Sequence, residues 1–486
     1  MKKTFITMLA LVAGAMVFTA CSSDEFENNN ETPSVLKPMT FYASMEEQGG
    51  ATRATIDGTF IKWENGDKIS IFDGSSENNG NQEFTLATGG GTISATFTGS
   101  AAAASTYYAL YPYVAVTSRT FTREEALAAF GGDEYEFEHE IEEDWQYFYE
   151  LSPEYAVEMV KDKMEMNDIS AENQAIIIAY LKNEPIVSGA QLEGNCIKGA
   201  VIPAEQIATP GSADPNAMLM IAKSTDASTL KFKNVCAYVK VTPQFNCSVI
   251  TITSNGEENL AGTVTVDYNE GNPTTTVTDN GSNSVYLKGT IIAGNTYYIA
   301  VRPETLKNGF FVDFLTDDKT HYYQRSTSKS FTFVRSNVIK LGEFETGGTW
   351  TYNGVTSGND GGHNWVLVAP NVRLATTALG VNIKGNEVDS HLSDWGAKWV
   401  VPLSTDLDGK LICTYDKNNK KATISGKGAL RELPIVMQVN SSNTWCKDSP
   451  SQSGFRYVIS LTTGGKARAN DNSNLYKHDI IYKYVG

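Results

Sequence analysis

Cys21 is the residue whose chemistry the surrounding sequence specifies most closely. Lys2 and Lys3 precede an apolar run over residues 5–18, which is too short to cross a membrane and remain there. This pattern predicts a secretory signal peptide over residues 1–20. Removal of that peptide leaves Cys21 at the new N-terminus, where its thiol and its free amino group are both sites for acylation.

The residues directly before this cysteine, Thr19 and Ala20, are small and resemble a bacterial lipobox. We therefore expect lipid attachment at Cys21, with palmitate among the acyl chains, and an outer-membrane lipoprotein exposed at the cell surface. An ordinary signal peptide followed by an unmodified cysteine is the alternative. Residues 22–38 are polar and begin with acidic side chains, and residues 21–53 form the predicted lipidated tether and candidate propeptide.

The other cysteines allow a second kind of chemistry. Five remain when Cys21 carries lipid, and an odd number cannot all pair within one exported chain. Cys413 and Cys446 both fall in the last segment and are the candidate disulfide. Cys236 and Cys247 are either a bridge between neighbouring strands or free buried thiols. The chain has no CxxC motif and no Cys/His ligand spacing, so we expect no metal site.

Catalytic motifs are missing from the sequence. It contains no GxSxG, HExxH, P-loop or GxGxxG pattern, and its five histidines are scattered singly. We therefore expect no catalytic residues, no cofactor and no enzyme activity. The net charge of −17 also disfavours nucleic acid as a partner, because phosphate binding requires a basic surface.

Most of that charge lies in one stretch. Residues 122–172 hold 17 Asp and Glu side chains against Arg123, Lys161 and Lys163. Within it, residues 134–142 (EYEFEHEIE) alternate acidic and apolar residues. As a strand, this segment would place five glutamates on one face, a candidate calcium or partner site. A solvated acidic face, on a strand or a helix, is the alternative.

The pattern of periodicity and turns predicts a mainly β protein with a third C-terminal β domain. We place an N-terminal β-sandwich at residues 54–226, a second at 227–345, a Gly-rich linker at 346–362 and the C-terminal domain at 363–486. Helix signals interrupt the first sandwich over residues 117–194. A capping box at Thr122 to Glu125 and helix starts at Ser152 and Ser170 predict an inserted helical subdomain.

The C-terminal domain holds four of the seven tryptophans. Trp395 and Trp399 lie close together in the sequence and are candidate ligand-binding residues if they are exposed, because indole rings stack on sugars and bind protein partners. Burial in a core is the alternative for both.

Several stretches in a fixed order resemble the fimbrillin, or type V pilin, family. They are the lipobox at Cys21, residues 50–54 (GATRA), 61–72 (IKWENGDKISIF), 107–112 (YYALYP), 201–206 (VIPAEQ) and 232–237 (FKNVCA). The resemblance covers about residues 41–344 without the helical insertion. It implies two transthyretin-like β-sandwich domains, the first of which carries that insertion.

The resemblance also implies assembly into a fimbrium by donor-strand exchange after lipoprotein export. An arginine-specific protease would cut between Arg53 and Ala54, and the strand over residues 39–45 would leave. A strand from another pilus subunit would then enter the vacated groove. Residues 480–485 are a candidate donor strand.

The helical insertion and the third domain depart from a plain stalk subunit. They favour an accessory, tip or anchor subunit, with the C-terminal domain as adhesive module for a glycan or protein on a host or bacterial surface. The alternative function is a glycan-binding outer-membrane lipoprotein of a nutrient-uptake system.

Overall fold

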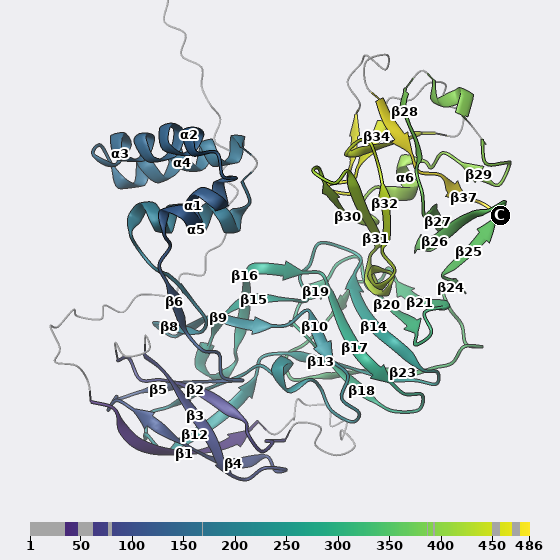
Figure 1. The fold of residues 1–486 in the computed structure, drawn as a ribbon. Helices are drawn as coiled ribbons and strands as arrows, with labels where there is room; N and C mark the ends of the chain where they lie inside the picture. Colours follow the sequence, from purple (N-terminus) through teal and green to yellow (C-terminus); the bar gives the residue numbers. More distant parts are fainter. Residues whose placement is uncertain are drawn as a thin grey trace, which may run out of the picture.

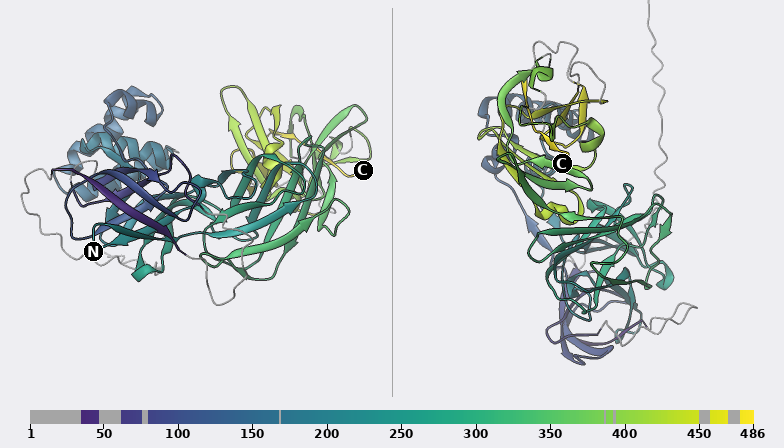
Figure 2. Two further views of the ribbon diagram at one scale, coloured as in Figure 1. Left: turned by 90° about the horizontal axis from the view of Figure 1, so that it is seen from below. Right: turned by 90° about the vertical axis from the view of Figure 1, so that its right-hand side faces the viewer.

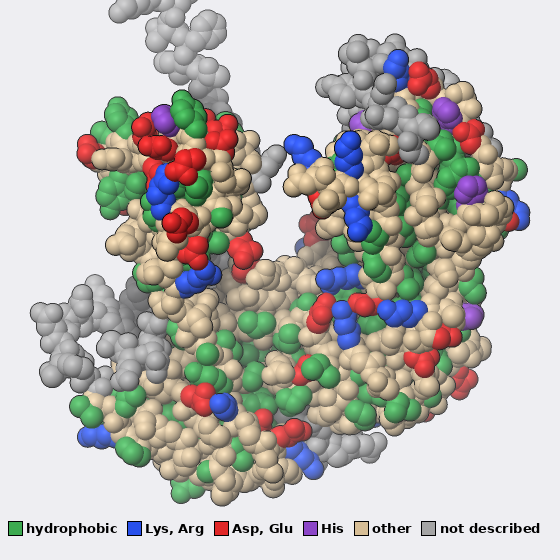
Figure 3. Space-filling model, viewed as in Figure 1, with side chains coloured by type: hydrophobic (Ala, Val, Ile, Leu, Met, Phe, Trp, Pro, Cys, Tyr) green, Lys and Arg blue, Asp and Glu red, His purple; other side chains and the backbone are tan. Residues whose placement is uncertain are grey.

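The computed structural model describes residues 35–46, 62–75, 80–167, 169–385, 387–391, 394–449, 457–468 and 477–486. The protein is mainly β, as the sequence predicts, and its helices gather in one insertion (Figure 1). Two β units lie side by side and form the base of the molecule (Figure 2). The helical insertion and the C-terminal unit both rise from the same side of this base, and the surface is hollowed between them (Figure 3).

The first unit is a closed barrel of seven strands in the order β1-β12-β11-β5-β2-β3-β4. Its core gathers aromatic side chains around Trp63, whose ring contacts Phe97, Tyr111 and Phe232 edge to face. The strands are β1 (Lys37–Met45), β2 (Lys68–Phe72), β3 (Asn81–Thr88), β4 (Ser94–Ala101), β5 (Tyr107–Tyr111), β11 (Met220–Ser224) and β12 (Thr229–Asn234).

The helical insertion stands on a two-stranded stem and has an apolar core of its own. Its elements are β6 (Thr117–Arg119), α1 (Arg123–Phe130), α2 (Glu134–Phe137), η2 (Glu138–Glu142), α3 (Glu143–Tyr149), α4 (Pro153–Met166), α5 (Ala171–Lys182) and β7 (Ile186–Ser188). The predicted capping box at Thr122 and Glu125 is confirmed, and Ser152 and Ser170 cap α4 and α5 as predicted. These helices begin where short side chains satisfy the first free backbone N–H groups.

The second unit stacks a six-stranded sheet, β10-β17-β14-β20-β21-β24, with smaller sheets, and its apolar core is continuous with that of the first barrel. Its long strands carry alternating or fully buried β-branched and aromatic residues, as two-sided sheets require. The elements are β8 (Gln191–Glu193), β9 (Cys196–Ile202), β10 (Glu205–Ile207), η3 (Pro215–Ala217), β13 (Ala237–Pro243), β14 (Cys247–Ser254), β15 (Ala261–Asp267), η4 (Asn269–Gly271), β16 (Thr274–Ser282), β17 (Ser284–Ile291), β18 (Tyr297–Val301), β19 (Thr305–Leu306), β20 (Phe310–Thr316), β21 (His321–Thr327), β22 (Phe331–Thr332), β23 (Val338–Phe344) and β24 (Tyr352–Val355).

The strand pairing differs from the predicted boundary at residues 226/227 and from the predicted linker at 346–362. β12 lies after residue 226 but closes the first barrel. β8, β9 and β10 lie before residue 226 but belong to the second unit, because β8 pairs with β9, β9 with β15 and β10 with β17. Residues 346–362 are not a linker, because β24 pairs with β21 and β25 (Ser357–Asp360) pairs with β26 (His363–Ala369). The sheet to which a strand belongs depends on backbone partners that lie far away in the chain. Local composition does not identify those partners.

The C-terminal unit packs its sheets around two apolar clusters. It docks on the second unit through η6 (Gly428–Glu432), which lies against β14, β17 and β20. Its remaining elements are β27 (Val372–Ala375), β28 (Leu379–Lys384), η5 (Val388–His391), β29 (Trp399–Val400), α6 (Ser404–Leu407), β30 (Leu411–Asp416), β31 (Lys421–Gly426), β32 (Ile435–Gln438), β33 (Asn443–Cys446), β34 (Tyr457–Ser460), β35 (Lys466–Arg468), β36 (Lys477–Ile480) and β37 (Lys483–Tyr484).

Candidate functional site

Strand β1 closes the first barrel, since it pairs with a neighbour along both edges (Figure 1). It runs antiparallel to β4, from Lys37 opposite Ala101 to Ser44 opposite Ser94. It runs parallel to β12, where the N–H of Tyr42 donates to the Ser228 carbonyl at 2.7 Å. In the chain, residues 46–93 separate β1 from β4 and residues 46–228 separate it from β12. Backbone hydrogen bonds and side-chain packing hold this strand, rather than a tight turn to either partner.

The side chains of β1 alternate between the core and the solvent. Phe41, Ala43 and Met45 point inward and are buried, whereas Tyr42 is 62% exposed. The Phe41 ring lies edge to face against Phe84 and Tyr107, with centroid distances of 5.5 and 5.3 Å. Without β1, these rings would face water and two sheet edges would lose their backbone partners.

An ion-pair cluster at Glu46 fixes the C-terminal end of β1 to the second unit. Its carboxylate accepts hydrogen bonds from Arg335 at 2.8 and 3.2 Å and from the Asn234 N–H at 3.2 Å. Lys233 Nζ lies 3.5 Å away. Burial alone would raise the pKa of the Glu46 carboxyl, but Arg335, Lys233 and the Asn234 N–H together lower it below its usual value. Glu46 therefore stays ionised and anchors the strand at the junction between the two units.

The predicted processing residues lie directly beyond this anchor. Glu46 is the last described residue before 47–61, so Arg53 and Ala54 lie outside the described residues, and Cys21 does as well. Cleavage at Arg53 and lipid attachment at Cys21 remain predictions.

The candidate ligand-binding tryptophans belong to an aromatic core. Trp399 is fully buried, with its ring 5.4 Å from that of Trp395. Trp395 is partly buried and stacks flat on His363, with ring centroids 3.9 Å apart. Of the two alternatives given for these tryptophans, core burial holds for Trp399, because its ring fills the interior of the C-terminal unit.

The predicted disulfide between Cys413 and Cys446 is not formed in the structure. Both residues are free, buried thiols in the same apolar cluster. Burial raises the pKa of Cys413 to about 11 and that of Cys446 to about 12, which keeps both thiols protonated and unreactive. Cys236 and Cys247 are free and buried too, which matches one of the two alternatives for them.

Residues 480–485 are part of the C-terminal core. Ile480, Ile481 and Tyr482 are buried, and β37 pairs with β27 and β29. A donor strand must have its apolar side chains free for another subunit, so this run is not a free donor.

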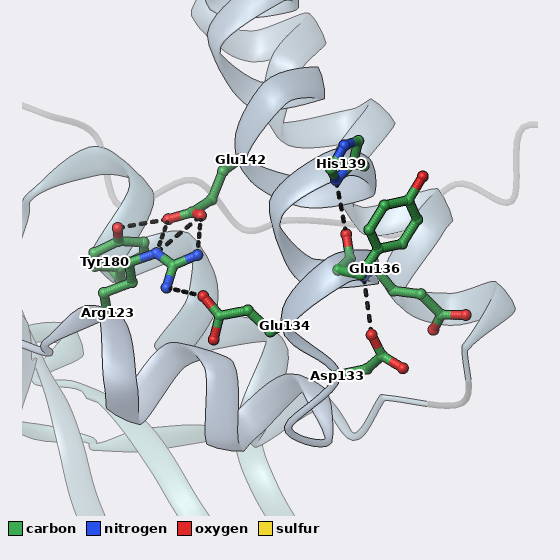
Figure 4. Close-up of polar contacts among 8 residues, drawn as sticks. Arg123, Asp133, Glu134, Glu136, His139, Glu142 and Tyr180 are labelled. Atoms are coloured by element: carbon green, nitrogen blue, oxygen red, sulfur yellow. Dashed lines mark hydrogen bonds and ion pairs between the residues drawn. The ribbon is translucent and has the colours of Figure 1, made fainter.

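The acidic segment 134–142 is helical rather than extended, which removes the strand of five aligned glutamates. Arg123 draws two of these glutamates together (Figure 4): it donates to Glu142 at 2.7–2.9 Å and to Glu134 at 2.6 Å. The Tyr180 hydroxyl donates to Glu142 at 2.7 Å, and burial followed by this contact raises the pKa of Tyr180 to about 12. Among the described residues, no group of three or more His, Cys, Asp or Glu side chains is arranged to hold a metal ion.

None of the described helices is long and apolar enough to span a membrane.

No protein-family model matches the chain, and no curated protein sequence matches it. Solved structures with some likeness include a candidate cell adhesion protein of Bacteroides ovatus (11% identity, 67% of this chain, 100% of that chain, TM-score 0.30). A candidate cell adhesion protein of Bacteroides uniformis matches at 15% identity over 65% of this chain and 96% of that chain, with a TM-score of 0.31. A fimbrial protein of Bacteroides ovatus matches at 12% identity over 76% of this chain and 62% of that chain, with a TM-score of 0.23. Likeness at this level carries no argument about what this chain does.

Proposed function

We propose that this chain is a subunit of a surface fibre, with an adhesive C-terminal unit, and that a strand from another subunit replaces β1 during assembly. The observation that carries the proposal is the position of β1, which closes a barrel through two sheet edges and three buried side chains. A strand held in this way can be exchanged for another strand with the same alternation of buried and exposed residues.

The route to the surface follows from the sequence motifs. The signal peptide directs export, and lipid at Cys21 carries the precursor to the outer membrane. Cleavage between Arg53 and Ala54 then separates β1, together with the lipid, from the rest of the barrel. The cut chain keeps β1 only by non-covalent contacts, so a competing strand is able to displace it.

The position in the fibre follows from the C-terminal unit. Residues 480–482 are buried in this folded unit and β37 is paired within it, so this run is not free to act as a donor strand. A subunit that accepts a strand at β1 and keeps this run in its own core suits an accessory or tip position. If Arg53 stays intact, the lipid stays attached and the same chain is an anchor subunit.

The second candidate is a glycan-binding lipoprotein of a nutrient-uptake system. Burial of Trp399 removes one of the two indole rings that were candidates for stacking on a sugar. The hollow between the second β unit and the C-terminal unit, with Lys410 and Lys427 in its lining, is a different basis for glycan binding. Neither candidate assigns a catalytic role to the chain.

The N-terminus of protein released from the cell surface tests cleavage directly. We expect it to be Ala54 in the wild type, and we expect Arg53→Ala and Arg53→Lys both to leave the chain beginning at lipidated Cys21, because an arginine-specific protease requires the guanidinium. Arg119→Ala removes another exposed arginine and should leave processing unchanged. If every fraction begins at Cys21 and holds no higher oligomer, the polymerising version is wrong and only a lipid-anchored subunit remains. Mass spectrometry distinguishes these results.

A further inference from the structure

A pocket of about 660 Å³ lies at the junction of the second β unit and the C-terminal unit. One wall comes from the ends of β14, β20 and β21. The other comes from the turn between β26 and β27 and from the residues that flank the β30–β31 hairpin. Small-molecule sites commonly have volumes of about 300–1,000 Å³ and often lie between domains. Size and location therefore both suit a ligand.

The lining of this pocket has a specific chemistry. Ten of its nineteen lining residues carry a side-chain hydroxyl or amide group, and Phe311 adds a partly exposed aromatic ring. Two lysines, Lys410 and Lys427, are its charged groups, and no Asp or Glu lies among the described residues that line it. A cationic pocket free of carboxylates in a chain of net charge −17 indicates an anionic ligand with many hydroxyl groups.

The cationic side chains continue along the junction. Asn283 and Lys427 also line a second hollow of about 370 Å³, which holds one acidic residue among the described ones that line it, Glu257. Arg431 lies there too and pairs with Glu205 at 3.4 Å, so Lys427 is the unpaired cation that the two hollows share. Lys427 is exposed and forms no ion pair or hydrogen bond within the described parts of the chain, so its ammonium group is available. Lys410 donates one bond to the Thr405 carbonyl at 2.8 Å and retains two further N–H groups. The two hollows share Asn283 and Lys427, and together they are called the groove.

The walls of the groove are held in place before any ligand binds. Tyr322 and Leu430 line the pocket and also belong to the apolar cluster that joins the two units. Beside them, the Ala429 N–H donates to buried Asp313 at 3.2 Å, and Lys288 pairs with Glu432 at 2.8 Å. A preformed site loses little conformational entropy on binding.

We propose that this groove binds an acidic oligosaccharide. The sugar hydroxyls would face the hydroxyl and amide groups of the wall formed by β14, β20 and β21. Carboxylate or sulfate groups of the saccharide would pair with Lys427 and Lys410. An extended acidic peptide fits less well, because the wall offers polar side chains in place of a row of apolar side-chain pockets. The inference goes beyond strand exchange: the groove lies away from β1, so a chain that never polymerises would bind the same ligand.

Calorimetry on the full-length protein in detergent tests the site with four probes. These are tetragalacturonic acid, its methyl ester, a chondroitin sulfate hexasaccharide and hexaglutamate. We expect at least one acidic saccharide to bind about tenfold more tightly than the methyl ester, and we expect added salt to weaken that binding. Chondroitin sulfate carries both carboxylate and sulfate groups, so binding of that probe alone would show that the carboxylates of tetragalacturonic acid are not sufficient.

Three variants locate the binding. Lys427→Gln should weaken acidic-saccharide binding about tenfold, and Ser328→Trp should abolish it by filling the exposed mouth of the pocket. The matched control, Lys417→Gln, removes an exposed lysine of the same unit outside the groove and should change nothing. The proposal is overturned if no saccharide binds, if the methyl ester or hexaglutamate binds as tightly as the acidic saccharides, or if Lys427→Gln behaves like the control.

Discussion

Replacing Phe41 with alanine should lower the free energy of unfolding of the barrel by about 3–5 kcal/mol, the usual cost of removing a buried phenylalanine. Phe41 is fully buried, and its ring packs against Phe84 and Tyr107, so little of the resulting cavity can collapse. Because no tight turn joins β1 to either of its partner strands, the loss should fall mainly on attachment of this strand.

Hydrogen exchange measured by mass spectrometry separates loss of β1 from general unfolding. In Phe41→Ala, amide protons of β1, β4 and β12 should exchange faster than in the wild type, while those of the C-terminal unit keep their rates. Tyr42→Ala is the matched control on the same strand, because this side chain points outward, and we expect a change within about 0.5 kcal/mol. Equal exchange in β1 of both variants would contradict the role assigned to the buried Phe41 ring in holding this strand.

Asp313→Asn should remove a pH dependence from the docking of the C-terminal unit. Asp313 is fully buried on β20 and accepts hydrogen bonds from the Tyr322 hydroxyl at 2.9 Å and from the Ala429 N–H at 3.2 Å. Burial raises the pKa of this carboxyl from 3.8 to about 7, although both hydrogen bonds act in the opposite direction.

The sign of the effect follows from proton binding. Between pH 4 and pH 7 the folded protein holds a proton on Asp313 that the unfolded chain has released, so this contribution to stability falls as the pH rises. The pKa difference corresponds to about 4 kcal/mol, and the loss is complete above pH 7. An asparagine keeps a carbonyl acceptor without the charge, so Asp313→Asn should be more stable than the wild type at pH 8 and about equal to it at pH 4.

Urea unfolding over this pH range checks the prediction, with Asp317→Asn as control for an exposed carboxylate near the end of the same strand. Gly428→Ala is an independent test of the same contact. Its added Cβ would clash with Asp313 Oδ2 at 2.2 Å, and the Gly428 φ of +62° is one that residues with a Cβ rarely adopt. We expect this change to loosen docking at every pH. Parallel pH profiles for the wild type and Asp313→Asn would contradict the role assigned to Asp313.

Local features of the fold could be predicted from the sequence. The strand over residues 39–45 is confirmed as β1, and the helix starts at Thr122, Ser152 and Ser170 have the predicted caps. The residues that specify each of these features lie within a few positions of one another. Periodicity and helix-capping patterns in the sequence therefore predict them.

Strand partners could not be predicted, because they lie far away in the chain. The Asn65-Gly66 turn is present, but β2 pairs with β3 and β5 instead of forming the local hairpin that this turn suggests. The contacts around the candidate sites could not be predicted for the same reason, since they join residues that are far apart in the sequence. Glu46 meets Arg335 across 289 residues, and Asp313 meets Ala429 across 116 residues.

Burial of single side chains was the other limit. Trp399 and Trp395 have the same residue type and similar neighbours in the sequence, yet one is fully buried and the other is partly buried. Only the three-dimensional packing of the C-terminal unit distinguishes a core tryptophan from one that is open to solvent.

Exchange of β1 for a labelled copy of itself tests the central claim most directly. The full-length protein would be cut with an arginine-specific protease and incubated with an isotope-labelled peptide of residues 35–46, and its mass measured by native mass spectrometry. We predict that the cut protein takes up the labelled strand and releases its own, faster in Phe41→Ala, whereas a labelled peptide with aspartate at position 41 is not incorporated. A cut protein that stays folded, retains its own β1 and takes up no labelled peptide, even in Phe41→Ala, would contradict the account.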